Sequence, residues 1–129
     1  MARVLVVDGS HLMVWIVQML VPDGVQVVQA SRFADAQALL AGDPPDAAIF
    51  NLTPWHLDWQ RLIALCHEHA PPIPFVLCST LDSELPGELE LPVPPLAVIR
   101  KPARISDLRA TLSALLAEVE HRSGGGPPG

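Results

Sequence analysis

The sequence predicts an α/β fold, in which a doubly wound, five-stranded parallel sheet has helices on both faces. Short runs of apolar and β-branched residues recur along the chain, and segments with helical periodicity separate most of them. The chain is also of a suitable size, since 129 residues, 50% of them hydrophobic, supply one core of ordinary volume. Strands that alternate with helices are joined by right-handed crossovers, which makes the sheet parallel and places helices on both faces.

The first strand is expected at residues 3–8, an almost continuous apolar run that is typical of a strand buried on both faces. A helix follows over residues 10–21, and Ser10 can cap it because its hydroxyl accepts a hydrogen bond from an N–H of the first turn. A Pro-Asp-Gly sequence at 22–24 ends this helix by turn chemistry. The β-branched residues 25–29 then predict the second strand.

The middle of the chain repeats this alternation. Residues 33–41 are rich in alanine and leucine and predict a second helix, which a Gly-Asp-Pro-Pro sequence at 42–45 ends. Residues 46–52 predict the third strand, residues 57–70 the third helix, and residues 73–78 the fourth strand. The third helix has one apolar face, formed at i, i+3, i+4 and i+7 by Trp59, Leu62, Ile63 and Cys66.

The last third contains the fifth strand and the last helix. Residues 96–100 predict the strand and residues 106–121 the helix, whose apolar stripe is Leu108, Leu112, Leu115 and Val119. The link at 79–95 carries helix-breaking residues, namely Pro86, Gly87, Pro92, Pro94 and Pro95. It leaves room for one or two helical turns at 81–85, so the fourth helix should be short or missing.

Composition argues against several classes of protein. A formal charge of −6 and a pI near 5.1 disfavour binding to nucleic acid or to an anionic membrane surface, both of which attract basic patches. The longest apolar runs, such as 12–16 and 73–77, are too short to span a bilayer, and no secretory signal is evident. We therefore expect a cytoplasmic domain over residues 1–122, with a flexible Gly/Pro tail or the start of a linker at 123–129.

Four segments resemble the receiver domains of bacterial two-component response regulators. They are VLVVD at 4–8, PDAAIFNL at 45–52 with Pro54, IPFVLCS at 73–79 and VIRKP at 98–102. They occur in the family's order on the predicted strands, and the resemblance covers about residues 2–120. It implies the flavodoxin-like receiver fold, in which the ligand crevice lies at the carboxyl ends of the strands.

The resemblance implies a phosphorylation site, yet this chain departs from it. Receivers accept a phosphoryl group from a histidine kinase on an aspartate at the end of the third strand, where this chain has Asn51. An amide lacks the anionic oxygen that attacks phosphorus, so we expect no acyl phosphate and no enzymatic activity. The family's Mg²⁺ site needs adjacent acidic residues after the first strand, whereas this chain has Asp8, Gly9 and Ser10, so metal binding should be poor.

Three more positions of the family's site can be assigned by the resemblance. Ser79 matches the hydroxyl residue after the fourth strand, Val98 stands where receivers place an aromatic switch residue, and Lys101 matches the phosphoryl-contacting lysine. Lys101 is the only lysine in the chain, and we expect its ammonium to reach Asp8 and the Asn51 carbonyl and hold the crevice in one state. The alternative is an ordinary surface charge. The resemblance also implies a cis peptide bond before Pro102.

Cysteine and histidine side chains can bind zinc, but the sequence supplies only one pair of them at a suitable spacing. Cys66 and His69 are i, i+3 on a predicted helix, which can start a zinc site, although no second ligand pair is evident. Cys66 and Cys78 lack CxxC spacing and are expected to be reduced core thiols. His67 and His69 are expected to be solvated.

Other chemistries have plainer interpretations. The triad residue types in DGSH at 8–11 are too close in sequence for a hydrolase, and the segment lacks the spacing of a phosphate-binding loop. Trp55 and Trp59 flank the loop after Asn51; core packing is the expected role of Trp59, and a cap over the crevice is the alternative.

Two functional hypotheses follow. The first is a pseudo-receiver, a phosphorylation-independent protein–protein interaction module of bacterial signal transduction that uses no cofactor. The second is a receiver-like sensor whose crevice between Asp8, Asn51, Ser79 and Lys101 binds a small ligand, a nucleotide or an anion. Ligand binding at 100 times Kd would add about 2.7 kcal/mol of stability, so a thermal-shift screen separates the two.

The first helix is the expected partner surface. A stripe that docks it on the sheet consists of Met13, Ile16, Val17 and Leu20, while the opposite side carries Val14, Trp15, Gln18 and Met19. A helix that is apolar on all sides and lies in an outer layer is expected to be covered by a partner protein. A second copy of the chain is the simplest partner. The alternative is that Trp15 folds over the last helix and the valines are scattered surface residues.

Overall fold

The computed structural model describes residues 2–8, 11–51, 59–69, 71–80, 95–101 and 104–124. Its strands are β1 (Arg3–Val7), β2 (Gln26–Ala30), β3 (Ala47–Asn51), β4 (Phe75–Thr80) and β5 (Ala97–Lys101). Its helices are α1 (His11–Leu20), α2 (Phe33–Gly42), α3 (Trp59–Glu68) and α4 (Ile105–Gly124). All predicted strands and helices with described residues are therefore present. Of the predicted link at 79–95, residues 81–94, which include the expected helical turns at 81–85, lie outside the described residues.

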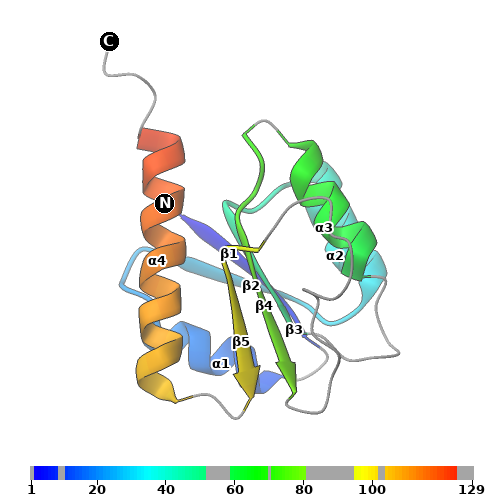
Figure 1. The fold of residues 1–129 in the computed structure, drawn as a ribbon. Coiled ribbons are helices and arrows are strands. Elements are labelled where there is room, and N and C mark those ends of the chain that lie inside the picture. Colours follow the sequence, from blue (N-terminus) through cyan, green and yellow to red (C-terminus); the bar gives the residue numbers. More distant parts are fainter. Residues whose placement is uncertain are drawn as a thin grey trace.

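The five strands form one parallel sheet in the order β2-β1-β3-β4-β5 (Figure 1). The order reverses at β1, which pairs with β2 on one side and with β3 on the other. Such a reversal is the switch point of a doubly wound sheet, beside which ligand crevices form. The predicted fold class is confirmed.

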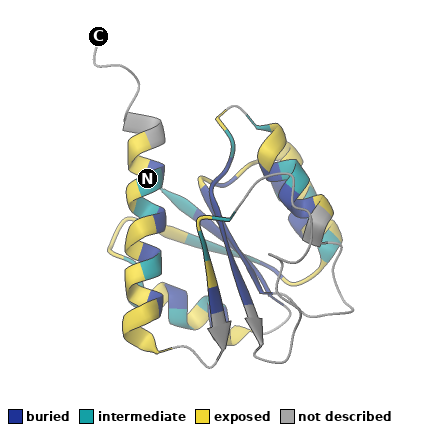
Figure 2. Cartoon of the chain, in the orientation of Figure 1, coloured by how far each residue is buried: buried dark blue, intermediate teal, exposed yellow. Residues whose placement is uncertain are grey.

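Helices cover both faces of the sheet, with α1 and α4 on one side and α2 and α3 on the other (Figure 1). The side chains of β1 alternate between the two core layers: Leu5 and Val7 pack under α2 and α3, and Val4 and Val6 pack under α1 and α4. All four side chains are fully buried, as the dark central strands in Figure 2 show. Burial on both faces explains why the strand contains no polar residue between Arg3 and Asp8.

Element boundaries differ from the predicted ones where backbone chemistry intervenes. β4 begins at Phe75 and not at residue 73, because Pro74 has no N–H for the ladder and the N–H of Ile73 donates to the Cys66 carbonyl over 3.0 Å. At its other end β4 continues to Thr80. The last helix continues to Gly124, two residues into the predicted tail 123–129, of which 125–129 lie outside the described residues. Within the described part of the chain, no helix is both long and apolar enough to cross a membrane.

Candidate functional site at the carboxyl edge of the sheet

Strand register brings four of the predicted site positions to one edge of the sheet. Val7 is paired with Phe50, so Asp8 and Asn51 come next on the two central strands. Asn51 is paired with Cys78, and Ser79 follows it on β4. Thr80 is paired with Lys101, which is the last residue of β5. The positions expected from the sequence therefore lie along the carboxyl ends of neighbouring parallel strands.

Asp8 and Asn51 are the buried polar residues of the described chain, with exposed fractions of 6% and 8%. The backbone of Asp8 is held from β2, since its N–H donates to the Ala30 carbonyl over 3.1 Å and its carbonyl accepts from Gln29 Nε2 over 3.0 Å. No fully buried side-chain nitrogen or oxygen among the described residues lacks a hydrogen-bond partner. Burying polar groups costs free energy unless they are hydrogen-bonded, and here that condition is met.

Asn51, which the resemblance described above matches to the phosphoryl-accepting aspartate of receivers, ends β3. Its amide oxygen is uncharged and accepts hydrogen bonds, and its nitrogen only donates them. Neither atom can attack phosphorus to give an acyl phosphate. The sheet thus presents one carboxylate, that of Asp8, and one amide at the central pair of strand ends.

Several predicted features fall on residues whose positions or side chains are outside the described set. Gly9 and Ser10, Trp55, and the bond before Pro102 belong to this group. So do the side chains of Trp59, Ser79 and Lys101, whose backbones lie at the start of α3, near the end of β4 and at the end of β5. The contact of Lys101 with Asp8 and Asn51 stays a prediction.

Val98, the predicted switch position, is on the outer strand of the sheet and is 41% exposed. Its register partner is Leu77, which packs in the core layer under α2 and α3. Its neighbour Ile99 is buried in the other layer, as strand alternation requires. The residue at this place is therefore a partly exposed apolar side chain without an aromatic ring.

The outer face of α1 is apolar and exposed, as predicted, but its members differ in part. Trp15 and Met19 are 62% and 60% exposed and Gln18 is exposed, whereas Val14 is half-buried against the core. Val14 lies one residue after Met13 and three before Val17, and therefore points to the buried side of the helix. Leu12, absent from the prediction, is 61% exposed and lies i, i+3 and i+7 with the other two. We call Leu12, Trp15 and Met19 the α1 outer face.

Cys66 and His69, considered above as the start of a zinc site, have different surroundings in the described structure. Cys66, on α3, is buried in the core layer between the sheet and helices α2 and α3, and its desolvation raises the pKa of the thiol from 9.0 to about 12. No group of three His, Cys, Asp or Glu residues that could hold a metal occurs among the described residues. His69 was expected to be solvated, and this was wrong: its Nε2 donates to the Leu40 carbonyl over 2.6 Å. It thereby satisfies a carbonyl in the last turn of α2, which helix geometry leaves open.

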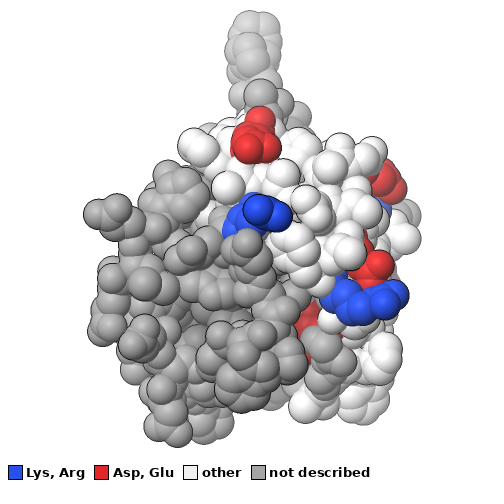
Figure 3. All heavy atoms as spheres, turned by 90° about the vertical axis from the view of Figure 1, so that its right-hand side faces the viewer, with Lys and Arg blue, Asp and Glu red and all other residues white. Residues whose placement is uncertain are grey.

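The surface beside α2 and α3 shows no concentration of one charge. Figure 3 shows few charged side chains among the described residues on this side, with both signs close together. At the start of α2, Arg32 Nε and Asp35 Oδ2 form an exposed ion pair at 3.4 Å. The described residues on this side therefore do not form a basic stripe of the kind that attracts a phosphate backbone.

Comparison with known proteins identifies the fold. No protein-family model matches the chain, and no curated protein matches it. Solved structures do match: a CheY-like response regulator receiver domain protein from Methanospirillum hungatei has 21% identity and a TM-score of 0.76, over 93% of this chain and 97% of that one. A response regulator from Thermotoga maritima has 20% identity and a TM-score of 0.71, over 90% and 98%.

The receiver domain of a signal transduction histidine kinase from Syntrophus aciditrophicus is similar to the same degree. It has 20% identity and a TM-score of 0.73, over 93% of both chains. At such low identity the likeness is one of backbone arrangement along nearly the whole chain. The chain therefore has the flavodoxin-like fold of response-regulator receiver domains.

Proposed function

We propose that this chain is a pseudo-receiver, a protein–protein interaction module of bacterial signal transduction that works without phosphorylation and without catalysis. The observation that carries the proposal is Asn51, an amide at the end of β3, buried beside the position of Asp8. The fold supports the signalling context, and the amide removes the nucleophile on which phosphoryl acceptance depends.

Metal chemistry supports the same conclusion. Mg²⁺ binds in proteins through oxygen ligands and prefers carboxylates for charge. Asp8 is followed in the sequence by Gly9 and Ser10, and the end of β3 carries the amide of Asn51. Of these four residues, Asp8 alone supplies a carboxylate. One carboxylate neutralises only half of the charge of Mg²⁺, so the metal should bind weakly. Without the metal, the negative charge of an incoming phosphoryl group would not be neutralised.

The partner surface in this proposal is the α1 outer face. The whole helix contains no Asp, Glu, Lys or Arg, and its three exposed apolar side chains stand on one side of it. Buried interface cores are depleted of charge and enriched in tryptophan and methionine. Trp15 is the expected centre of the interface, because a large aromatic residue between two aliphatic ones matches the usual composition of hot spots.

A second copy of the chain is the simplest partner. In a two-fold dimer the same patch meets itself, so an uncharged apolar face finds an uncharged apolar complement. Two buried free thiols, Cys66 and Cys78, fit a reducing compartment, and we place the domain in the cytoplasm. The charge of −6 makes direct binding of this domain to nucleic acid or an anionic membrane unfavourable.

Sedimentation equilibrium tests the interaction part of the proposal. The wild-type chain should associate, and the double variant Trp15→Ala, Met19→Glu should be monomeric, because truncation of a central tryptophan alone costs about 2 kcal/mol or more of binding. Leu96→Ala removes a different exposed apolar side chain and should leave association unchanged. Association should also be the same with and without acetyl phosphate. A monomeric wild type would eliminate the homodimer through α1.

A further inference from the structure

A second surface feature lies at the opposite, amino-terminal edge of the sheet. A groove of about 520 Å³ is formed there by residues that precede the strands and by the second half of α4. It is lined by Ala2, Pro22, Val25, Asp46, Leu116, Val119 and Glu120. Figure 1 shows the reason, since the start of β1 lies beside the later turns of α4. We call this the amino-edge groove.

The lining combines an apolar floor with two carboxylates. Ala2, Val25 and Leu116 are half-buried and pack against the core layer under α1 and α4, so the floor is fixed by the fold. Asp46 comes from the loop between α2 and β3, and Glu120 from α4, and both residues are exposed. Carboxylates from two separate elements therefore face one apolar groove.

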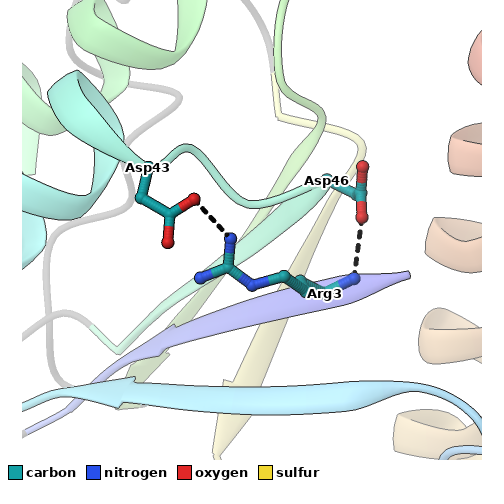
Figure 4. A network of polar contacts seen from close by, with 3 residues as sticks. All are labelled: Arg3, Asp43 and Asp46. Carbon is teal, nitrogen blue, oxygen red and sulfur yellow. Dashed lines mark hydrogen bonds and ion pairs between the residues drawn. The ribbon is translucent and has the colours of Figure 1, made fainter. Parts of the chain in front are cut away.

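Neither carboxylate has a cation as partner in the described structure. Asp46 Oδ2 accepts only a backbone N–H, that of Arg3, over 2.7 Å. The guanidinium of Arg3 turns the other way and pairs with Asp43 Oδ1 over 3.0 Å, as Figure 4 shows. The ion pairs found among the described residues do not include Glu120. Among the described residues, therefore, no cation forms an ion pair with either carboxylate of the groove.

We propose that the amino-edge groove binds a peptide segment of another protein in which an apolar side chain is flanked by arginine or lysine. The apolar side chain covers the floor, and the basic neighbours pair with Asp46 and Glu120. Small-molecule sites enclose most of their ligand, whereas this groove is partly open to solvent, which suits a peptide better. The negative charge of the whole chain adds to the attraction for a basic partner.

This surface is independent of the proposed interaction through α1 and of the residues at the carboxyl edge. The residues that line it include no member of the α1 outer face, and they lie at the other end of the strands from Asp8 and Asn51. A basic peptide can therefore be recognised whether or not the chain dimerises. Failure of one proposal leaves the other standing.

NMR on the ¹⁵N-labelled full chain tests the proposal with acetyl-Arg-Leu-Arg-amide as the probe. We expect saturable shifts of the amides of Ala2, Val25, Leu116 and Glu120 at peptide concentrations up to about 5 mM, where a millimolar site is mostly occupied. Acetyl-Arg-Ser-Arg-amide should bind several-fold more weakly, because it lacks the apolar side chain. Acetyl-Glu-Leu-Glu-amide should not bind.

Variants sharpen the test. Glu120→Gln should weaken binding of the probe about threefold, because one exposed ion pair contributes little binding free energy. Added salt should weaken binding further, because it screens the remaining charges. Asp107→Asn, on the same helix but outside the groove, should leave the affinity unchanged. Absence of shifts at the groove, equal binding of the acidic peptide, or concentration-dependent shifts of these amides without peptide would overturn the proposal. The last result would mean that a second copy occupies the groove.

Discussion

The carboxyl edge of the sheet buries polar side chains, whereas the α1 outer face exposes apolar ones. At the carboxyl edge, Asp8 and Asn51 are polar and buried. On the α1 outer face, Leu12, Trp15 and Met19 are apolar and exposed. Most residues elsewhere follow the ordinary rule of apolar inside and polar outside. Departures from that rule concentrate where a fold retains or acquires function, and here they mark two candidate sites, one at the carboxyl edge and one on the α1 outer face.

The largest expected effect contrasts two leucines that are close in sequence. Leu5 is fully buried in β1, and Leu5→Ala should reduce the free energy of unfolding by about 3 kcal/mol through lost burial and the cavity it leaves. Leu12 is mostly exposed, and Leu12→Ala should change it by less than about 0.5 kcal/mol for the monomer. Urea denaturation at low protein concentration measures both. Similar losses would show that the α1 outer face belongs to the core.

A second contrast concerns the buried thiol, which behaves as an apolar group only while it is protonated. Because the pKa of Cys66 rises from 9.0 to about 12 on folding, the folded state holds its proton more tightly than the unfolded state. Stability is therefore complete below pH 9 and is lost as the pH rises towards 12, by about 2 kcal/mol at pH 10.5. Cys66→Val should remove this component of the pH dependence. An unchanged profile in the variant would contradict the assignment.

A smaller effect is expected at His69, whose ring N–H donates to the Leu40 carbonyl. His69→Ala leaves that carbonyl without its donor and should cost about 1 kcal/mol of unfolding free energy. The exposed neighbour His67 provides the matched control, since His67→Ala should change stability little. Equal effects of the two substitutions would show that the hydrogen bond adds nothing to stability.

The parts of this fold that depend on local pattern could be predicted from the sequence. Continuous apolar runs predicted β1 and β3, and the stripe of α1 around Met13 and Val17 follows from the helical period of 3.6 residues. The positions of Asp8 and Asn51 at strand ends followed from the same pattern. Leu12 follows the same helical period, at i, i+3 and i+7 with Trp15 and Met19, but the predicted outer face contained Val14 and not Leu12.

Features made by contacts between distant segments were not predicted. The His69 hydrogen bond requires α3 to lie against the end of α2, and the hydrogen bond from Arg3 to Asp46 joins residues 43 positions apart. The amino-edge groove forms where the segments that precede β1, β2 and β3 lie against α4. The periodicity of a single sequence predicts which side of a helix or strand is buried. It does not predict which other segment packs against that side.

Phosphoryl acceptance is the most direct test of the central claim that the carboxyl edge is chemically silent. The chain is incubated with acetyl phosphate and Mg²⁺, and its intact mass is measured alongside that of Asn51→Asp. The mass of the wild type should be unchanged, and the variant should gain little phosphoryl group, because Gly9 still denies the metal a second carboxylate. A phosphoryl adduct on the wild-type chain would contradict the account.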